Sequence, residues 1–142
     1  MLSCFDVAEY FLSLADEDAG DQISNSKLQK LVYYAQGFSL VLLGRSLFEE
    51  RIEAWEHGPV VPDLYRKYRH HGSDGITTQS EIDYDKFSEE ERELLDEVYE
   101  CFGQFSAWKL KNLSHEEPPW KDYKGTIIPN DAMAEYFKTQ VI

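Results

Sequence analysis

The sequence predicts a mainly α-helical fold, a compact domain of about six helices with a small β-hairpin or two short strands. Three observations favour this fold class. Apolar residues recur at three- and four-residue steps along most of the chain. Serine or asparagine precedes several of these segments at the position of a helix N-cap. One segment, residues 24–43, is long enough to form a rod of about 30 Å, the width of a small domain.

Residues 24–43 are expected to form the helix around which the rest is arranged. Four apolar residues on one stripe are expected to be fully buried: Leu31, Ala35, Phe38 and Leu42. Ser24 is expected to cap the start, and Gly44 to end the helix. The second half is apolar on nearly every side, so we expect the helix to be wrapped by other segments. The polar residues Lys27, Gln29, Lys30 and Gln36 exclude a membrane span.

The other helices are expected over residues 3–16, 62–71, 88–102, 106–113 and 130–139. Ser3, Ser88, Ser106 and Asn130 are expected to be their N-caps where such a residue is present. The helix that ends near residue 113 is not expected to continue, because Pro118 and Pro119 follow. Residues 46–48 and 52–55 are expected to form the β element, and residues 76–87 an extended connection.

Length and charge narrow the classes of function. The 142 residues suit one domain over residues 1–142 that can bury a core without disulfides or a metal. A net charge of −13 argues against binding to nucleic acid, which needs clustered Lys and Arg. The start of the chain lacks the basic and apolar regions of a signal peptide. Cys4 and Cys101 are interpreted as buried free thiols, so the predicted location is cytoplasmic, with no membrane partner.

Two histidines have acidic neighbours and raise the alternative of a hydrolase or a metal-dependent enzyme. Glu56 precedes His57, and Glu116 and Glu117 follow His115. Two such pairs brought together could form a metal site or an acid–base couple. No two histidines have metal-ligand helical spacing, however, and the common nucleophile and phosphate-loop motifs are absent. We therefore favour hydrogen-bonding or binding roles for His57 and His115, with no catalytic residue, metal or cofactor.

A basic cluster and three tryptophans are the other candidates for a binding surface. The basic cluster consists of Arg66, Lys67, Arg69, His70 and His71. It fits either a solvated helix face or a contact with an acidic partner. The tryptophans are Trp55, Trp108 and Trp120. Trp120 follows two prolines that hold its ring in place, either in the core or toward a partner.

Five motifs together resemble a known family. They are DVAEYFL near the start, ISNSKLQKLVYYAQG, LFEERIEAWEHGPVVPDLYRKYR, LSHEEPPW, and a closing I-x-x-x-x-M-x-x-YF pattern from Ile128 to Phe137. In this order the chain resembles the Panacea, or SocA-like, antitoxin domain, also known in phage and prophage proteins as GepA-like. The resemblance spans nearly the whole chain.

The resemblance implies a helical domain with a small β element that serves as the antitoxin of a toxin–antitoxin system. Members of this family look like non-catalytic modules that neutralise a toxin by direct binding. At least one type acts as an adaptor that presents its toxin to a protease of the AAA+ class. The expected partner is thus a cognate protein toxin encoded by the adjacent gene, and no cofactor is implied. A phage-encoded regulatory interaction protein is the other non-enzymatic alternative.

The positions that recur in the family fall on this sequence at Lys27, Leu28, Gln29, Lys30, Leu31, Tyr33, Trp55, His57, Gly58, Pro59, Val60, Tyr65, His115 and Trp120. From some of these family positions and from nearby polar residues of the segment 62–71, we expect a partner-binding surface. It is composed of Trp55, His57, Gly58, Pro59, Val60, Asp63, Tyr65, Arg66, Arg69, His115 and Trp120. The turn at Gly58 and Pro59 is apolar and stiffened by proline, so it loses little entropy when a partner docks. The alternative for Trp55, Val60 and Val61 is that they fill the core.

Overall fold

The fold is mainly α-helical, as the sequence predicts. The computed structural model describes residues 1–15, 22–77 and 81–141. In chain order these contain α1 (Cys4–Leu14), α2 (Asn25–Leu42), β1 (Glu53–Trp55), β2 (Gly58–Val60), α3 (Pro62–Tyr68), α4 (Glu89–Phe102), α5 (Ala107–His115), α6 (Pro118–Lys121) and α7 (Asn130–Phe137), with short 3-10 turns at Arg69–His71 and Tyr84–Lys86. Residue 16, the predicted end of the first helix, lies outside the described residues, as do residues 78–80 of the predicted extended connection.

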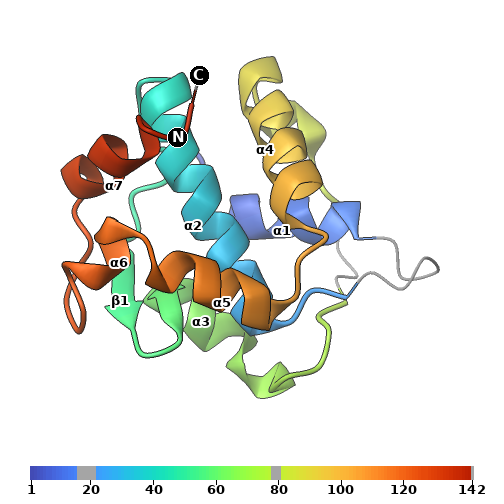
Figure 1. Cartoon of the computed structure of the whole chain (residues 1–142). Helices are drawn as coiled ribbons and strands as arrows, with labels where there is room; N and C mark the ends of the chain where they lie inside the picture. Colours follow the sequence, from blue (N-terminus) through green and yellow to red (C-terminus); the bar gives the residue numbers. More distant parts are fainter. Residues whose placement is uncertain (16–21, 78–80, 142) are drawn as a thin grey trace.

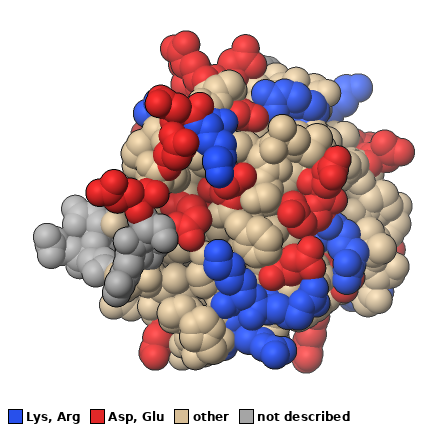
Figure 2. Space-filling model, turned by 180° about the vertical axis from the view of Figure 1, so that it is seen from behind, with Lys and Arg blue, Asp and Glu red and all other residues tan. Residues whose placement is uncertain are grey.

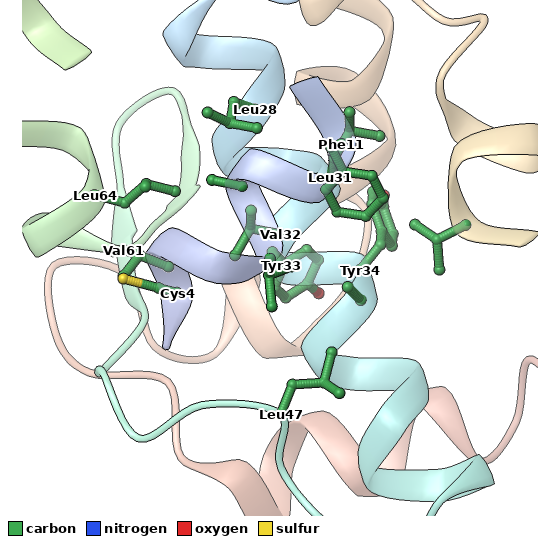
Figure 3. Close-up of a cluster of buried hydrophobic side chains, with 14 of the residues drawn as sticks. Cys4, Phe11, Leu28, Leu31, Val32, Tyr33, Tyr34, Leu47, Val61 and Leu64 are labelled. Atoms are coloured by element: carbon green, nitrogen blue, oxygen red, sulfur yellow. The ribbon is translucent and has the colours of Figure 1, made fainter. Parts of the chain in front are cut away.

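The central position of α2 is confirmed. Helices α1, α3, α4, α5 and α7 and strand β2 all pack on it (Figure 1). Ser24 caps its start by accepting a hydrogen bond from the Lys27 amide at 3.2 Å. Leu31 and Ala35 are fully buried, as expected from the apolar stripe. Side chains from α1, α2, α3 and the segment after α2 point toward one another in the core (Figure 3).

The polar residues of α2 are buried, and they bind neighbouring backbone segments. The Gln36 amide donates from Nε2 to the Phe48 carbonyl at 2.9 Å and accepts at Oε1 from the Leu47 amide at 2.8 Å. The Lys27 ammonium donates to the Gly103 carbonyl after α4. Because a buried backbone group must find a partner, each of these side chains fixes the path of one surrounding segment.

The second half of α2 is less covered than its apolar sequence suggests. Leu42 is 52% exposed, and Phe38 is only partly buried, so the expectation that both are fully buried is wrong. The reason is the placement of the polar residues. The hairpin, α5 and the segment at Leu47 and Phe48 are held by side chains of the first two thirds of the helix, which leaves the last turn to α4 and the C-terminal segment.

The β element is a hairpin, but one strand differs from the expectation. β1 and β2 pair in antiparallel register, with Glu53 opposite Val60 and Trp55 opposite Gly58. Residues 46–48 form no strand, because their backbone groups bond to the Gln36 side chain and not to another strand. Residues 52–55 were predicted as a strand, and most of that segment is β1. The strand that pairs with β1 is β2, which begins at Gly58, and not the segment 46–48.

The helix count and several caps also differ in detail. Seven α-helices occur in the described residues, one more than expected, because Pro118 begins the short helix α6. Proline is tolerated in a first helical turn, where its missing N–H would have no intrahelical acceptor. Ser3, Ser88 and Ser106 are N-caps as predicted, whereas Pro129, not Asn130, takes that position in α7. Cys4 is buried and Cys101 is exposed, so the expectation of a second buried thiol is wrong.

Gly37 is the point of closest approach between α2 and α7. A Cβ atom at this position would lie 2.2 Å from Cε2 of the Phe137 ring. The ring is 1% exposed and contacts Tyr33 and Phe38, so it has little room to move. The neighbour that leaves no room for a side chain at Gly37 is thus an aromatic ring. Among the described residues, no helix combines the length and apolar character that crossing a membrane requires.

We expect Gly37→Ala to destabilise the protein even though alanine favours helices. Alanine gains about 1 kcal/mol in helix propensity, while overpacking a core costs roughly 1–3 kcal/mol, so the net loss should reach up to about 2 kcal/mol. Urea unfolding of the purified variant measures it. In a Phe137→Leu background the same change should be neutral or stabilising. A more stable Gly37→Ala single variant would contradict the close contact.

Candidate functional site

The hairpin and α3 both pack on α2, and two tryptophan-centred contacts join the hairpin to α6 and to α3. The indole Nε1 of Trp120 in α6 donates to the Trp55 carbonyl at 2.7 Å. The ring of Trp55 packs edge-on against Tyr65 of α3, with ring centroids 5.0 Å apart. Trp120 is buried and Trp55 is half-buried. Trp120 therefore anchors the hairpin from the protein interior, and Trp55 forms part of the hairpin surface.

A chain of side-chain amides fixes the segment that follows the hairpin. Gln29 accepts from the Val61 amide at 2.9 Å and donates to the Asn25 side chain at 2.8 Å. Asn25 in turn donates to the Tyr65 carbonyl at 3.3 Å. Both amides are buried. This network ties the first turns of α2 to the backbone before and within α3, so the hairpin and α3 behave as one rigid unit.

Gly58 is required at the hairpin turn for two reasons. Its φ of +122° is a conformation that residues with a side chain rarely adopt. A Cβ atom there would also lie 2.9 Å from Cε of Lys30 and 3.2 Å from Oγ of Ser114. The turn thus leaves a space that the Lys30 side chain fills, and α2, the hairpin and α5 meet at this point.

The structure divides the predicted site residues into exposed and buried ones. His57, Arg66 and Arg69 are exposed, and Trp55, Asp63, Tyr65 and His115 are half-buried. Gly58, Pro59, Val60 and Trp120 are buried. These four buried residues support the surface from the protein interior. We refer to the exposed and half-buried set of Trp55, His57, Asp63, Tyr65, Arg66 and Arg69 as the hairpin face.

Charges on and beside the hairpin face are paired locally. Arg66 bonds to Asp63 one turn away on α3. Glu53 accepts from Trp55 Nε1 at 2.9 Å and from Arg51 at 2.5 Å, and these two hydrogen bonds lower the pKa of its carboxyl group.

Figure 2 shows the molecule from behind, with a connected group of Lys and Arg side chains among acidic ones. Basic groups are thus concentrated locally on a chain of strong net negative charge.

His115 lies in a confined place beside the hairpin. Its ring stacks on Trp120, with centroids 3.8 Å apart and an angle of 10° between the planes. The ring also hydrogen-bonds to the backbone of Glu56, while its Nε2 atom is buried without a partner in the described part of the chain. Burial lowers the pKa of His115, and Lys111, Lys30 and His57 lower it further. This contact with Glu56 fits the predicted hydrogen-bonding role for His115.

The Glu117 side chain does not pair with His115. Its carboxylate accepts hydrogen bonds from the hydroxyl groups of Tyr33 and Tyr34, both at 2.8 Å, and also from Tyr136. Burial raises its pKa from 4.5 to about 7, although the three tyrosine hydrogen bonds act in the opposite direction. Glu117 therefore links α2, α6 and α7 in the core, and the acid–base couple considered from sequence does not include it.

In residues 1–15, 22–77 and 81–141, no three His, Cys, Asp or Glu side chains converge closely enough to hold an ion. His57 and His115 are near enough for their charges to interact. What the geometry around the hairpin provides is a rigid, partly aromatic surface beside buried basic groups.

Comparison with known proteins identifies the family. The sequence pattern of the family described as "Antitoxin SocA-like, Panacea domain" matches residues 28–121, from α2 through α6. This region includes the whole hairpin, the start of α3 and Glu117. The chain belongs to the SocA-like antitoxin family with a Panacea domain.

A curated relative supports the same family. Antitoxin SocA of Caulobacter vibrioides (strain NA1000 / CB15N) is 36% identical over 110 residues, which cover 69% of this chain and 58% of the relative. The chain thus spans less than two thirds of the relative's length. No solved structure matches the chain. The resemblance noted from the sequence motifs is thereby confirmed at the level of the family.

Some residues that build the site in this SocA-like protein were not assigned roles from sequence. Asn25 was not singled out in the sequence. Gln29 was named only as a polar residue that excludes a membrane span and as a family position, and Glu117 only as a neighbour of His115. The signal that could have found them is a helix with polar residues on every side whose flanking segments are rich in loops. Such a helix must pair those side chains with loop backbone if it is to be buried.

The raised pKa of Glu117 predicts a pH-dependent stability. Between about 4.5, its ordinary pKa, and about 7, its folded pKa, the folded protein holds a proton that the unfolded chain releases. Stability should therefore fall as the pH rises through this window, by at most about 3 kcal/mol from this group. Denaturant unfolding at several pH values measures this. Glu117→Gln should remove most of the fall, whereas Glu116→Gln, at an exposed neighbouring position, should retain it. Equal pH profiles in wild type and Glu117→Gln would contradict the assignment.

Proposed function

We propose that this protein is a non-catalytic antitoxin that neutralises a protein toxin by direct binding through the hairpin face. The observation that carries the proposal is the rigid presentation of Trp55 and Tyr65 next to charged residues of α3, within the region that matches the family. Aromatic residues with a paired charged rim are typical of protein–protein contacts.

Rigidity supports binding at this face. The Trp55 carbonyl is held by Trp120, and the Val61 amide is held by Gln29. Gly58 and Pro59 are buried at the turn. A surface already fixed in one conformation loses little entropy on association, so more of the contact energy contributes to affinity.

The composition of the face supports a specific protein partner. Trp55 and Tyr65 supply apolar area, since both rings are only half-buried. Asp63, Arg66 and Arg69 supply opposite charges within two turns of the chain. Arginine and tryptophan are enriched among the residues that contribute most to binding energy, and mixed charges favour one partner over others.

The partner in this proposal is a toxin encoded by the adjacent gene, and both act in the cytoplasm. In a second version of this proposal, the protein acts as an adaptor and delivers the bound toxin to a AAA+ protease. Direct neutralisation predicts that a stoichiometric complex blocks the toxin without proteolysis. Adaptor action predicts loss of toxin only when the protease is present. Purified components distinguish the two.

Changing the charged residues of the hairpin face together tests the surface. The triple variant Asp63→Ala, Arg66→Ala and Arg69→Ala should fold with a stability change of about 0.5 kcal/mol per exposed site. It should bind the adjacent-gene toxin at least tenfold more weakly, about 1.4 kcal/mol, because the charged rim is lost. Calorimetric titration measures the affinity, and growth of cells that express the toxin measures the rescue.

A matched control uses the same types of charge on another face. Lys121, Asp131 and Lys138 are exposed on and after α6 and α7. Their triple alanine variant should bind and rescue as the wild type does. Full rescue by the hairpin-face variant would place the toxin elsewhere, and a wild-type protein that binds no neighbouring gene product would refute the antitoxin role.

A further inference from the structure

A buried lysine, which forms no ion pair within the described residues, lies beneath the hairpin turn. Lys30 is 1% exposed, and its ammonium group donates to Oγ of Ser26 at 2.9 Å. An ammonium group has three N–H donors, and no carboxylate in the described residues forms an ion pair with this one. Burying an unpaired charge is unfavourable, so this position calls for an explanation beyond folding.

The charged groups around Lys30 are also basic. Lys111 of α5 and His115 interact electrostatically with it, and His57 of the hairpin turn acts on His115. Burial and the charge of Lys111 lower the pKa of Lys30 to about 8. Among the titratable neighbours on α2, the hairpin and α5, none of those that perturb these two groups is a carboxylate. The cluster lacks a negative charge.

Two nitrogen atoms of this cluster have unused hydrogen-bonding capacity. Among the described residues, Nε2 of His115 is buried without a partner, since the ring's contact with Glu56 leaves the other nitrogen unused. Lys30 and Ser114, the residue before His115, both lie against Gly58, so the two groups belong to the same region of the fold. If His115 were protonated, Nε2 would become a second charged donor of the cluster. A single oxyanion would satisfy both donors and cancel the repulsion between the two basic groups.

The cluster is close to the protein surface. Ser26, which holds the Lys30 ammonium group, is exposed, as is His57, and Lys111 is half-buried. On α5, Trp108 lies one turn before Lys111 and two turns before His115, so the three share one side of the helix. Trp108 is 71% exposed. A large exposed aromatic ring on the same side of the helix as basic residues is an arrangement expected for contact with another protein.

We propose that Lys30, Lys111 and His115 form an oxyanion-binding site that receives one carboxylate group from the protein partner. The site itself is independent of the antitoxin role, whereas the assignment of its carboxylate to the toxin rests on the proposed function. It adds to the hairpin face a charge-paired anchor at the junction of α2, β2 and α5. The overall negative charge of the chain disfavours free anions, and a carboxylate carried by a docked protein avoids that penalty.

A binding site and a structural lysine predict opposite effects of one substitution. Lys30→Met keeps the aliphatic stem that fills the space above Gly58 and removes the ammonium group. If the ammonium group serves to bind an anion, the variant should melt at a higher temperature than the wild type, because an unpaired buried charge has been removed. If its bond to Ser26 supports the fold, the variant should melt at a lower temperature.

The direct test uses acetate and inorganic phosphate as probes on the isolated protein, at ionic strength matched with sodium chloride. Nitrogen-15 NMR should show the His115 Nε2 signal moving toward its protonated position as the probe is added, and the melting temperature should rise. Lys30→Met should show neither effect. Lys121→Met, at an exposed position on α6, should respond as the wild type does. Identical responses of wild type and Lys30→Met to both anions would overturn the site.

The same experiment identifies the source of the anion. A response to acetate comparable to the response to phosphate supports a carboxylate group. A response to phosphate alone overturns the carboxylate assignment and favours a phosphate group. Toxin binding by the wild type is measured separately. If the probes bind and the toxin does not, the site stands and the antitoxin role fails. If the toxin binds wild type and Lys30→Met equally, the site takes no part in that complex.

Discussion

The burial of polar side chains on α2 is the constraint on which the rest of the structure depends. A helix at the centre of a small domain is usually apolar on the buried side. Here Lys27, Gln29 and Gln36 are buried as well, and each bonds to the backbone of a different segment. These bonds replace the strand pairing or helical bonding that the loops lack. The helix therefore sets the positions of the loop after it, the hairpin and the end of α4 all at once.

Lys30 is the exception among these polar residues of α2. Its neighbours on the helix bond to backbone carbonyls or amides, whereas among the described residues its ammonium group has only the Ser26 hydroxyl as acceptor. Glu117 shows how the same core treats a buried charge that it retains for structure: three tyrosine hydroxyls surround the carboxylate. The contrast between a saturated carboxylate and an unsaturated ammonium group distinguishes a structural buried charge from one that awaits a partner.

The region that matches the family is shorter than the region that packs into the core. Residues 28–121 match the SocA-like family and contain the hairpin, Lys30 and His115. Helices α1 and α7 lie outside the match, yet Phe137 and Tyr136 of α7 contact Gly37 and Glu117 within it. The matched region thus contains the proposed binding residues, while flanking helices complete the core around them.

The sequence by itself determined the helical class, the central helix, most N-caps and the family. These depend on local signals: the spacing of apolar residues, capping boxes such as those at Ser3 and Ser88, and contiguous motifs. Tertiary structure alone decided that Gly58 pairs with Trp55, that Leu42 is exposed, and that the Gln36 side chain takes the hydrogen bonds expected of a strand. It also decided that Lys30 and Ser114, the residue before His115, lie against Gly58 of the hairpin. Each of these outcomes depends on how whole segments pack and on which groups are hydrogen-bonded, and short-range periodicity carries no information about either.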